Sequence, residues 1–281
     1  MSIQEQFELV PQEAYPNHIA LLPNGNRTWA RTHGLSEQEG HKIGVEVLIK
    51  FARSLRKLGI HTATVWGMST ENIRTRNPAE IANLVKLLHY VLDTTAQEAH
   101  EDGARLIHIG NKDMLPKEVV EKIVYWEEKT SNNTKHVANV AFGYGGHDEL
   151  LRAFKKAMVD IKAGKITFED LYKEDGKYHG KYPYMAFKNY LDTKDQPYPF
   201  PDLIIRNNNE LRLSGFMPWQ SVYSEFYPCP KLLPEMTEDD FKLAIIEYAK
   251  RNRKFGGDAT SAKAEINKVP VQVEKATLKS S

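Results

Sequence analysis

The chain has 281 residues, of which 41% are hydrophobic and 27% are charged, a balance typical of a globular protein that can bury a sizeable core. A formal net charge of +1 argues against attraction of nucleic acid or an anionic membrane by a general positive field, so any anion site must be local. The one cysteine, Cys229, excludes an internal disulfide framework and a four-thiolate zinc site. No signal peptide is visible, and no apolar run approaches the ~20 residues of a membrane span, so we expect a cytoplasmic protein.

Short apolar runs alternate with segments whose apolar residues have helical spacing. The runs predict strands at 18–22, 61–68, 105–109, 137–142 and 203–205, and the spacing predicts helices at 40–58, from 77, at 116–130 and from 148. This order predicts an α/β fold in which one largely parallel central sheet is flanked by helices. We expect a flexible lead-in at 1–17, a single catalytic domain at 18–257 that includes a Tyr-, Lys- and Pro-rich insert at 173–201, and a disordered tail at 258–281.

The first segment suited to an anion is 23–29, which follows the first predicted strand. Gly25 lets the backbone approach a ligand closely, and N–H groups around it could hold phosphate oxygens. For this segment alone, a structural glycine in a polar turn is the alternative.

Two further segments follow the second and fifth predicted strands. Residues 69–72 (Ser-Thr-Glu-Asn) offer a hydroxyl, a carboxylate and an amide, although a turn with a helix cap is the alternative. Arg206 and Arg212, with Ser214, could bind phosphate oxygens in pairs, although a solvated basic loop is the alternative. Because open α/β sheets bind ligands at the carboxyl ends of their strands, the three segments together predict one anion-binding edge.

In this order the motifs resemble those of the cis-prenyltransferases. The matching segments span 18–257 and include His18-Ile19-Ala20, Asn24-Gly25-Asn26, Trp29-Ala30, Gly40-His41-Lys42, Ser69-Thr70-Glu71-Asn72, Tyr144-Gly145-Gly146, Arg206, Glu210, Arg212-Leu213-Ser214, Trp219-Gln220-Ser221, Tyr223, Glu225 and Arg253-Lys254-Phe255-Gly256-Gly257. The resemblance implies a homodimer, a parallel sheet and a hydrophobic tunnel between the sheet and the helices.

The resemblance also implies roles for individual residues. It assigns the acceptor diphosphate to Arg206, Arg212 and Ser214, the donor diphosphate to Gly25, Asn26, Arg27 and Thr28, the reaction centre to Asn24, His41, Ser69, Glu71 and Asn72, and Mg²⁺ to Glu225. For His41, a helix cap or a plain hydrogen-bond partner is the alternative. Trp66, Met68, Leu84 and Leu88 are expected in the tunnel wall, with ordinary core packing as the alternative.

The chain departs from the family pattern mainly at the donor site. Asn24 stands where the family has an aspartate, and Thr28 and Glu37 stand where it has arginines. Further changes are Ile73 for tryptophan, Thr75 for arginine and His147 for arginine. The acceptor cluster is unchanged, and an amide is a poorer magnesium ligand than a carboxylate because it carries no charge.

An asparagine in place of the donor-site aspartate resembles the branch of the family that makes irregular terpenes of the lavandulyl type. The resemblance therefore predicts a prenyl diphosphate synthase that couples two dimethylallyl diphosphates head to middle, through loss of diphosphate and attack on the allylic cation. One alternative is regular elongation of an allylic substrate, such as dimethylallyl or geranyl diphosphate, with isopentenyl diphosphate. The other alternative is a non-catalytic partner subunit, against which the intact acceptor cluster argues.

Overall fold

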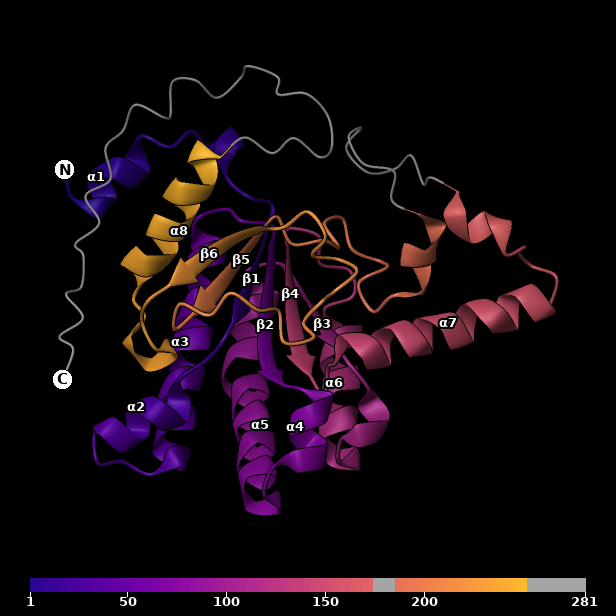
Figure 1. Ribbon diagram of the computed structural model, residues 1–281, viewed down its shortest axis with the longest axis horizontal. Helices are drawn as coiled ribbons and strands as arrows, with labels where there is room; N and C mark the ends of the chain where they lie inside the picture. The colour runs from indigo at the N-terminus through magenta and orange to yellow at the C-terminus, as the bar shows by residue number, and fades with distance from the viewer. Residues whose placement is uncertain (174–184, 252–281) are drawn as a thin grey trace.

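The computed structural model describes residues 1–173 and 185–251. Its sheet has six strands in the order β3-β4-β2-β1-β5-β6, and all neighbouring pairs are parallel. The strands are β1 His18–Leu22, β2 Thr62–Met68, β3 Ala104–Ile109, β4 His136–Phe142, β5 Leu203–Asn207 and β6 Glu225–Cys229. The predicted α/β fold with a parallel sheet is confirmed (Figure 1).

The helices follow the strands as the alternation predicts. They are α1 Ile3–Glu8, α2 Asn26–Thr32, α3 Glu37–Lys57, α4 Thr70–Thr75, α5 Pro78–Glu101, α6 Lys117–Lys129, α7 Gly146–Lys162 and α8 Glu238–Lys250, with 3-10 turns η1 Gln12–Ala14, η2 Lys112–Met114, η3 Glu169–Tyr172, η4 Ala186–Tyr190 and η5 Leu233–Glu235. Ser36 caps α3 with its hydroxyl, and Asn77 caps α5 just before Pro78. No helix within the described ranges is long and apolar enough to cross a bilayer.

The sheet is buried on both faces, as the apolar character of its strands requires. Side chains of one face, such as Ile19 and Leu21, pack in a core that includes residues of α3 and α8, and α5 and α6 cover the same face nearer β3 and β4. Side chains of the other face, such as Ala20 and Leu22, pack with Phe216. The face covered by α3 and α5 is the one that contains the large cavity described below.

The N-terminal segment differs from the flexible lead-in that the sequence predicted. Ser2 and Glu5 form a capping box at the start of α1, and Phe7 and Val10 are buried in the core that α8 completes. A helix this short is not stable alone, so its packing against α8 is what orders it. The predicted tail at 258–281, the motif at 253–257 and residues 174–184 of the 173–201 insert lie outside the described residues.

Strand β6, which contains Pro228, was not predicted from the sequence. β6 is an edge strand that pairs only with β5, and an edge strand tolerates proline since one row of its N–H groups faces away from the sheet. Helix α7 begins beside β4 and extends outward from the edge of the molecule (Figure 1). Its outer side therefore has few neighbours within the described part of the chain.

Candidate active site

A cavity of about 510 Å³ begins at the carboxyl ends of β1, β2 and β5 and continues between the sheet and helices α3 and α5. Every predicted donor, acceptor and reaction-centre residue lines it: Asn24, Gly25, Asn26, Arg27, Thr28, His41, Ser69, Glu71, Asn72, Arg206, Arg212 and Ser214. The three segments that the sequence analysis placed at one edge of the sheet therefore do line the same cavity. Of the predicted site residues, Glu225 alone is absent from the lining.

Residues 24–28, here called the donor loop, are fixed at the cavity mouth by their backbone. Gly25 has a φ of +96°, which favours glycine, and a Cβ at this position would lie 2.5 Å from the Leu232 side chain. The N–H of Leu233 also donates to the Asn24 carbonyl at 2.9 Å. Helix α2 begins directly after this glycine, at Asn26, where the sequence analysis predicted no helix.

The Asn24 side chain connects the donor loop to the acceptor cluster. Its Nδ2 donates to Oε1 of Glu210 at 3.0 Å, and its Oδ1 accepts from the Gly25 N–H at 2.8 Å. Oε2 of the same Glu210 forms ion pairs with Arg206 at 3.4 Å and with Arg212. The residue that replaces the family aspartate is therefore a hydrogen-bond donor to a carboxylate.

Arg206 is a buried cation whose N–H groups are poorly satisfied. Its side chain is 6% exposed, its Nε has no hydrogen-bond partner, and its nearest acceptors, Leu22 O and Glu210 Oε2, lie 3.5 and 3.4 Å away. Burial lowers the pKa of Arg206. Because an unsatisfied buried guanidinium is costly, this geometry favours an anion with several oxygens at the cavity mouth.

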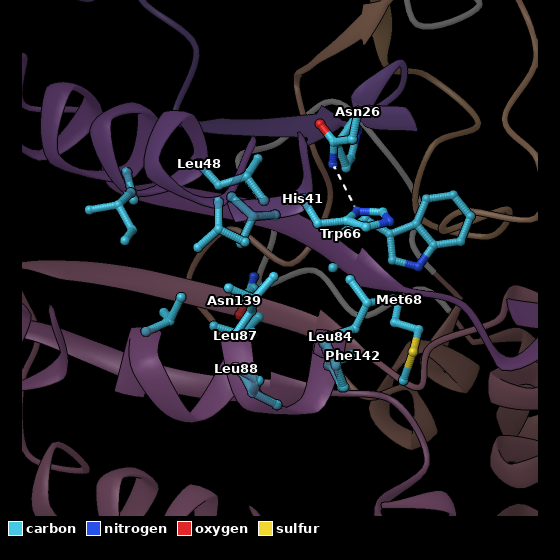
Figure 2. A pocket seen from close by; sticks show the side chains of 18 of the residues that line it. Asn26, His41, Leu48, Trp66, Met68, Leu84, Leu87, Leu88, Asn139 and Phe142 are labelled. Atoms are coloured by element: carbon cyan, nitrogen blue, oxygen red, sulfur yellow. Dashed lines mark hydrogen bonds between the residues drawn. The ribbon is translucent and has the colours of Figure 1, made fainter. Parts of the chain in front are cut away.

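His41 lies between the donor loop and α5. Its Nδ1 is 3.4 Å from Nδ2 of Asn26 (Figure 2). Its Nε2 is 3.2 Å from Oε1 of Glu80. Burial lowers the pKa of His41, although the Glu80 carboxylate opposes this effect. The Nε2 atom therefore carries the proton that Glu80 accepts. In this structure His41 is a hydrogen-bond partner of Glu80 and Asn26, which was one of the two alternatives given for it from the sequence.

Arg76 is a site residue that the sequence analysis did not assign. It lines the cavity, and its Nη1 donates to Oε1 of Glu80 at 2.8 Å. Burial lowers the pKa of Arg76, and the nearby charge of Arg27 lowers it further, so two cations lie together at the donor side. The sequence did contain the signal, because Arg76 directly follows Thr75, where the family arginine was missing.

The segment 69–72 (Ser-Thr-Glu-Asn) both caps helix α4 and forms part of the cavity wall. The Ser69 hydroxyl accepts from the Asn72 N–H at 3.0 Å, and the Asn72 side chain accepts from the Ser69 N–H at 3.3 Å. Burial alone would raise the pKa of Glu71, but hydrogen bonds from its own backbone and from Ser69 and Thr70 outweigh it and hold this pKa below its usual range. Glu71 is therefore an ionised carboxylate at the mouth.

The deeper cavity is apolar. Leu48 of α3 faces the α5 side chains Leu84, Leu87 and Leu88 (Figure 2), and the predicted wall residues Trp66, Met68, Leu84 and Leu88 all line the space. The lining continues along α5 to Ala99, 15 residues after Leu84, which is about 22 Å at 1.5 Å per residue.

The far end of the cavity is polar. Arg53 and Arg56 of α3 line it, and both form ion pairs with Glu98 of α5, at 2.5 and 3.0 Å. The space thus connects an arginine-rich mouth with a deep apolar channel that ends at charged side chains.

Comparisons with known proteins agree with this geometry. A family model described as putative undecaprenyl diphosphate synthase matches residues 22–256. The chain belongs to this family, the cis-prenyltransferases. It is 37% identical over 253 residues to an isoprenyl transferase of Clostridium perfringens (strain 13 / Type A), covering 90% of this chain and 94% of the relative.

Other relatives of this cis-prenyltransferase differ in the products that their names state. A tritrans,polycis-undecaprenyl-diphosphate synthase (geranylgeranyl-diphosphate specific) of Methanocaldococcus jannaschii is 37% identical, with 89% of this chain and 85% of the relative covered. Among solved structures, lavandulyl diphosphate synthase from Lavandula x intermedia in complex with dimethylallyl diphosphate has a TM-score of 0.79 at 32% identity, covering 87% of this chain and 99% of that one. A probable undecaprenyl diphosphate synthase from Campylobacter jejuni has a TM-score of 0.66 at 29% identity, with coverage of 86% and 98%.

The residues at this mouth do not form a ready magnesium site. Within residues 1–173 and 185–251, no three His, Cys, Asp or Glu side chains are grouped to hold a metal, and Asn24 supplies no charge. Glu225 lies opposite Leu203 at the amino end of β5, whereas Arg206 lies at its carboxyl end, and the Glu225 carboxylate accepts from Arg251 at 2.9 Å. One chain therefore does not bring Glu225 to the other site residues, and we assign no step to a protein-held metal.

Proposed function

We propose that this cis-prenyltransferase transfers the prenyl group of an allylic diphosphate to isopentenyl diphosphate. The observation that carries this proposal is Arg206, a buried and poorly satisfied cation at the mouth of a long apolar channel. Such a site suits a molecule with an anionic head and a hydrocarbon tail. The names of the curated relatives support elongation better than the head-to-middle coupling that the sequence favoured.

In the proposed reaction the C–O bond of the allylic diphosphate breaks, and the terminal alkene carbon of isopentenyl diphosphate bonds to the allylic carbon. The resulting tertiary cation loses a proton to give a new allylic diphosphate. We assign the departing diphosphate to Arg27 and Arg76 because both line the cavity and lie near each other. Fixed cations in a water-poor site stabilise developing negative charge strongly. The apolar channel excludes water that would trap the cation.

The length of the channel also supports elongation. An extended chain grows by about 5 Å per isoprene unit, so a channel of about 22 Å accommodates roughly four units. A branched ten-carbon product would occupy less than half of this length. We therefore propose products of intermediate length, limited by the polar far end at Arg53 and Glu98.

Head-to-middle coupling of dimethylallyl diphosphate is the second candidate. One observation favours it: the amide of Asn24, rather than a carboxylate, lies at the donor site and donates to Glu210. The likeness to the lavender enzyme structure is consistent with it. Both candidates share the same acceptor arginines, so they differ in the acceptor carbon and not in the anion site.

We further propose a homodimer, in which Mg²⁺ accompanies the substrate diphosphates. The support for the dimer is the outer side of α7, where Leu151, Phe154, Met158 and Val159 are exposed at helical spacing. An apolar helix face of this kind is suited to a second copy of the same helix across a two-fold axis.

Arg206→Ala tests the acceptor site. Loss of a charge-assisted hydrogen bond of about 1.5–3 kcal/mol should raise the KM for isopentenyl diphosphate on the order of tenfold or more, with a smaller change for the allylic substrate. Arg74→Ala, which removes an exposed arginine of α4 that does not line the cavity, is the matched control. Equal KM values in the parent and Arg206→Ala would remove the basis of the proposal.

A further inference from the structure

Glu210 lies between the two diphosphate sites and directs one carboxylate oxygen toward each. Oε1 accepts from the Asn24 amide at 3.0 Å, and Oε2 forms ion pairs with Arg206 at 3.4 Å and with Arg212. The Glu210 side chain is 15% exposed, so little water shares these contacts. One carboxylate therefore joins the donor loop to the acceptor arginines.

Backbone contacts hold Glu210 in this position from the acceptor side. The two preceding residues, Asn208 and Asn209, have φ values of +63° and +49°. Their N–H groups donate to Lys231 O at 3.1 Å and to Cys229 O at 3.0 Å. Because residues with positive φ need such support, the loop that presents Glu210 is fixed by the end of β6 and the chain that follows it.

The donor side is fixed by the same segment of chain. Leu233 donates its N–H to the Asn24 carbonyl, and Leu232 packs against Gly25. Asn24 and Glu210 are thus both anchored to residues 229–233. Their contact follows from the backbone arrangement and does not depend on two free side chains meeting by chance.

Glu210 uses the donors that an acceptor diphosphate needs. A carboxylate and a diphosphate bind guanidinium groups through the same N–H atoms, so the two anions compete for Arg206 and Arg212. The bond from Arg206 to Glu210 is long, and the Arg206 Nε has no partner, so Glu210 satisfies this arginine poorly. An anion with more oxygens can therefore displace it.

A displaced Glu210 still needs a hydrogen-bond donor, and Asn24 supplies one through Nδ2. An ionised aspartate at position 24 could not donate a hydrogen bond to Glu210. Its carboxylate would lie about as close to the Glu210 carboxylate as the Asn24 amide does now. Like charges at that distance repel strongly where little water is present. The amide at residue 24 is thus chemically matched to Glu210.

We propose that Glu210 is an internal competitor of the acceptor diphosphate, and that the Asn24 amide holds its carboxylate when the diphosphate takes the arginines. The inference rests on the proposed function and adds a positioning residue to it, since Glu210 acts through Arg206 and Arg212. It also gives the unusual Asn24 a role that is independent of metal binding.

Calorimetric titration of the chain with isopentenyl diphosphate tests this, because without an allylic partner no turnover occurs. Inorganic diphosphate, the head group alone, is the second probe. Glu210→Gln keeps the size of the side chain and removes its charge, so it should lower the Kd of both probes about fivefold. Glu247→Gln, which alters an ion pair on α8 far from the cavity mouth, is the matched control and should leave the Kd unchanged.

Asn24→Asp completes a double-mutant cycle. In the parent background it should raise the Kd about tenfold, because the added carboxylate presses Glu210 onto the arginines. In the Glu210→Gln background the same change should cost less than about threefold, since that contact has lost its charge. The difference between the two backgrounds measures the coupling of Asn24 to Glu210.

The inference is overturned if folded Glu210→Gln, with an unchanged melting temperature, binds both probes no better than the parent. It is also overturned if Asn24→Asp has the same effect in both backgrounds. Should Glu210→Gln not fold, an unchanged Kd in Asn24→Asp alone overturns it. A parent chain that binds neither probe contradicts the proposed function itself, whereas binding that Glu210→Gln leaves unaltered contradicts only this inference.

Discussion

The Nη1 atom of Arg76 lies 2.8 Å from Oε1 of Glu80, the carboxylate oxygen that also accepts from His41. This contact holds Arg76 at the predicted donor side of the cavity. At the three positions where the family has arginines on this side, the chain has Thr28, Glu37 and Thr75. Glu37 pairs with Arg31 at 2.5 Å, and its negative charge also opposes the lowering of the Arg76 pKa by burial. Arg27 and Arg76 therefore place positive charge beside the predicted donor site, at positions other than those where the family has arginines.

Arg76→Ala should raise the KM for the allylic diphosphate on the order of tenfold or more and leave the KM for isopentenyl diphosphate within about twofold. Arg74→Ala is the matched control, since Arg74 is an exposed arginine of α4 that does not line the cavity. Steady-state kinetics with each substrate varied in turn would measure both values. Equal effects of the two variants would show that Arg76 has no special role at the donor site.

The channel makes a prediction about product length. Thr95 of α5 lines the cavity 11 residues after Leu84, whereas Thr94 is exposed, and both hydroxyls donate to the carbonyl four residues earlier. Thr95→Trp should shorten the longest product by one or two isoprene units, because about 16 Å of channel remain before the new side chain. Thr94→Trp should leave the product distribution unchanged.

Chromatography of the dephosphorylated products would distinguish these outcomes. Unchanged product lengths in Thr95→Trp, with normal turnover, would mean that the growing chain does not follow α5.

The pH dependence of stability should reflect two buried histidines. Burial lowers the pKa of His18 and of His108 to about 4, against about 6.5 in the unfolded chain. Between these values the unfolded state binds more protons, so the free energy of unfolding should fall as the pH decreases from 6.5. The loss should reach about 2 kcal/mol per histidine by pH 5.

Urea unfolding of the parent, His108→Gln and His33→Gln at pH 7 and pH 5 would test this. His108→Gln should show a smaller loss between the two pH values than the parent, whereas exposed His33 should make no difference. An equal loss in the parent and His108→Gln would rule out His108 as a source of the pH dependence.

The proposed homodimer depends on the outer side of α7. One chain has a mass of 32.1 kDa, and light scattering at micromolar concentration should give twice this mass. Phe154→Glu should shift the measured mass toward that of the monomer. Lys155→Glu, a charge change on the same helix outside the exposed apolar group, is the control. A monomeric parent chain would contradict the proposal.

Much of this structure follows from local sequence patterns, and what was missed depends on tertiary contacts. Strand β1, which contains Ile19 and Leu21, is a short apolar run of the kind that a buried parallel sheet requires, so the local sequence was sufficient to predict it. α1 and β6 have weak local signals, and both are ordered by neighbours, α8 in one case and β5 in the other.

The candidate site shows the same division. The predicted donor, acceptor and reaction-centre residues follow strands in the sequence, and parallel strands share one carboxyl edge. Their position after the strands was therefore enough to predict that they line one cavity. Motif order could not show that Glu225 begins its strand at the other edge, or that Arg76 occupies the space near Arg27. Neither fact follows from spacing, since each depends on how two distant segments lie side by side.

The most direct test of the account is an incubation with dimethylallyl diphosphate, with and without isopentenyl diphosphate, followed by phosphatase treatment and gas chromatography. Regular elongation predicts linear alcohols of fifteen or more carbons that appear only when isopentenyl diphosphate is present. Geranyl diphosphate should serve as a starter under the same conditions. A branched ten-carbon alcohol formed from dimethylallyl diphosphate alone, with no longer products when isopentenyl diphosphate is added, would contradict elongation and establish head-to-middle coupling.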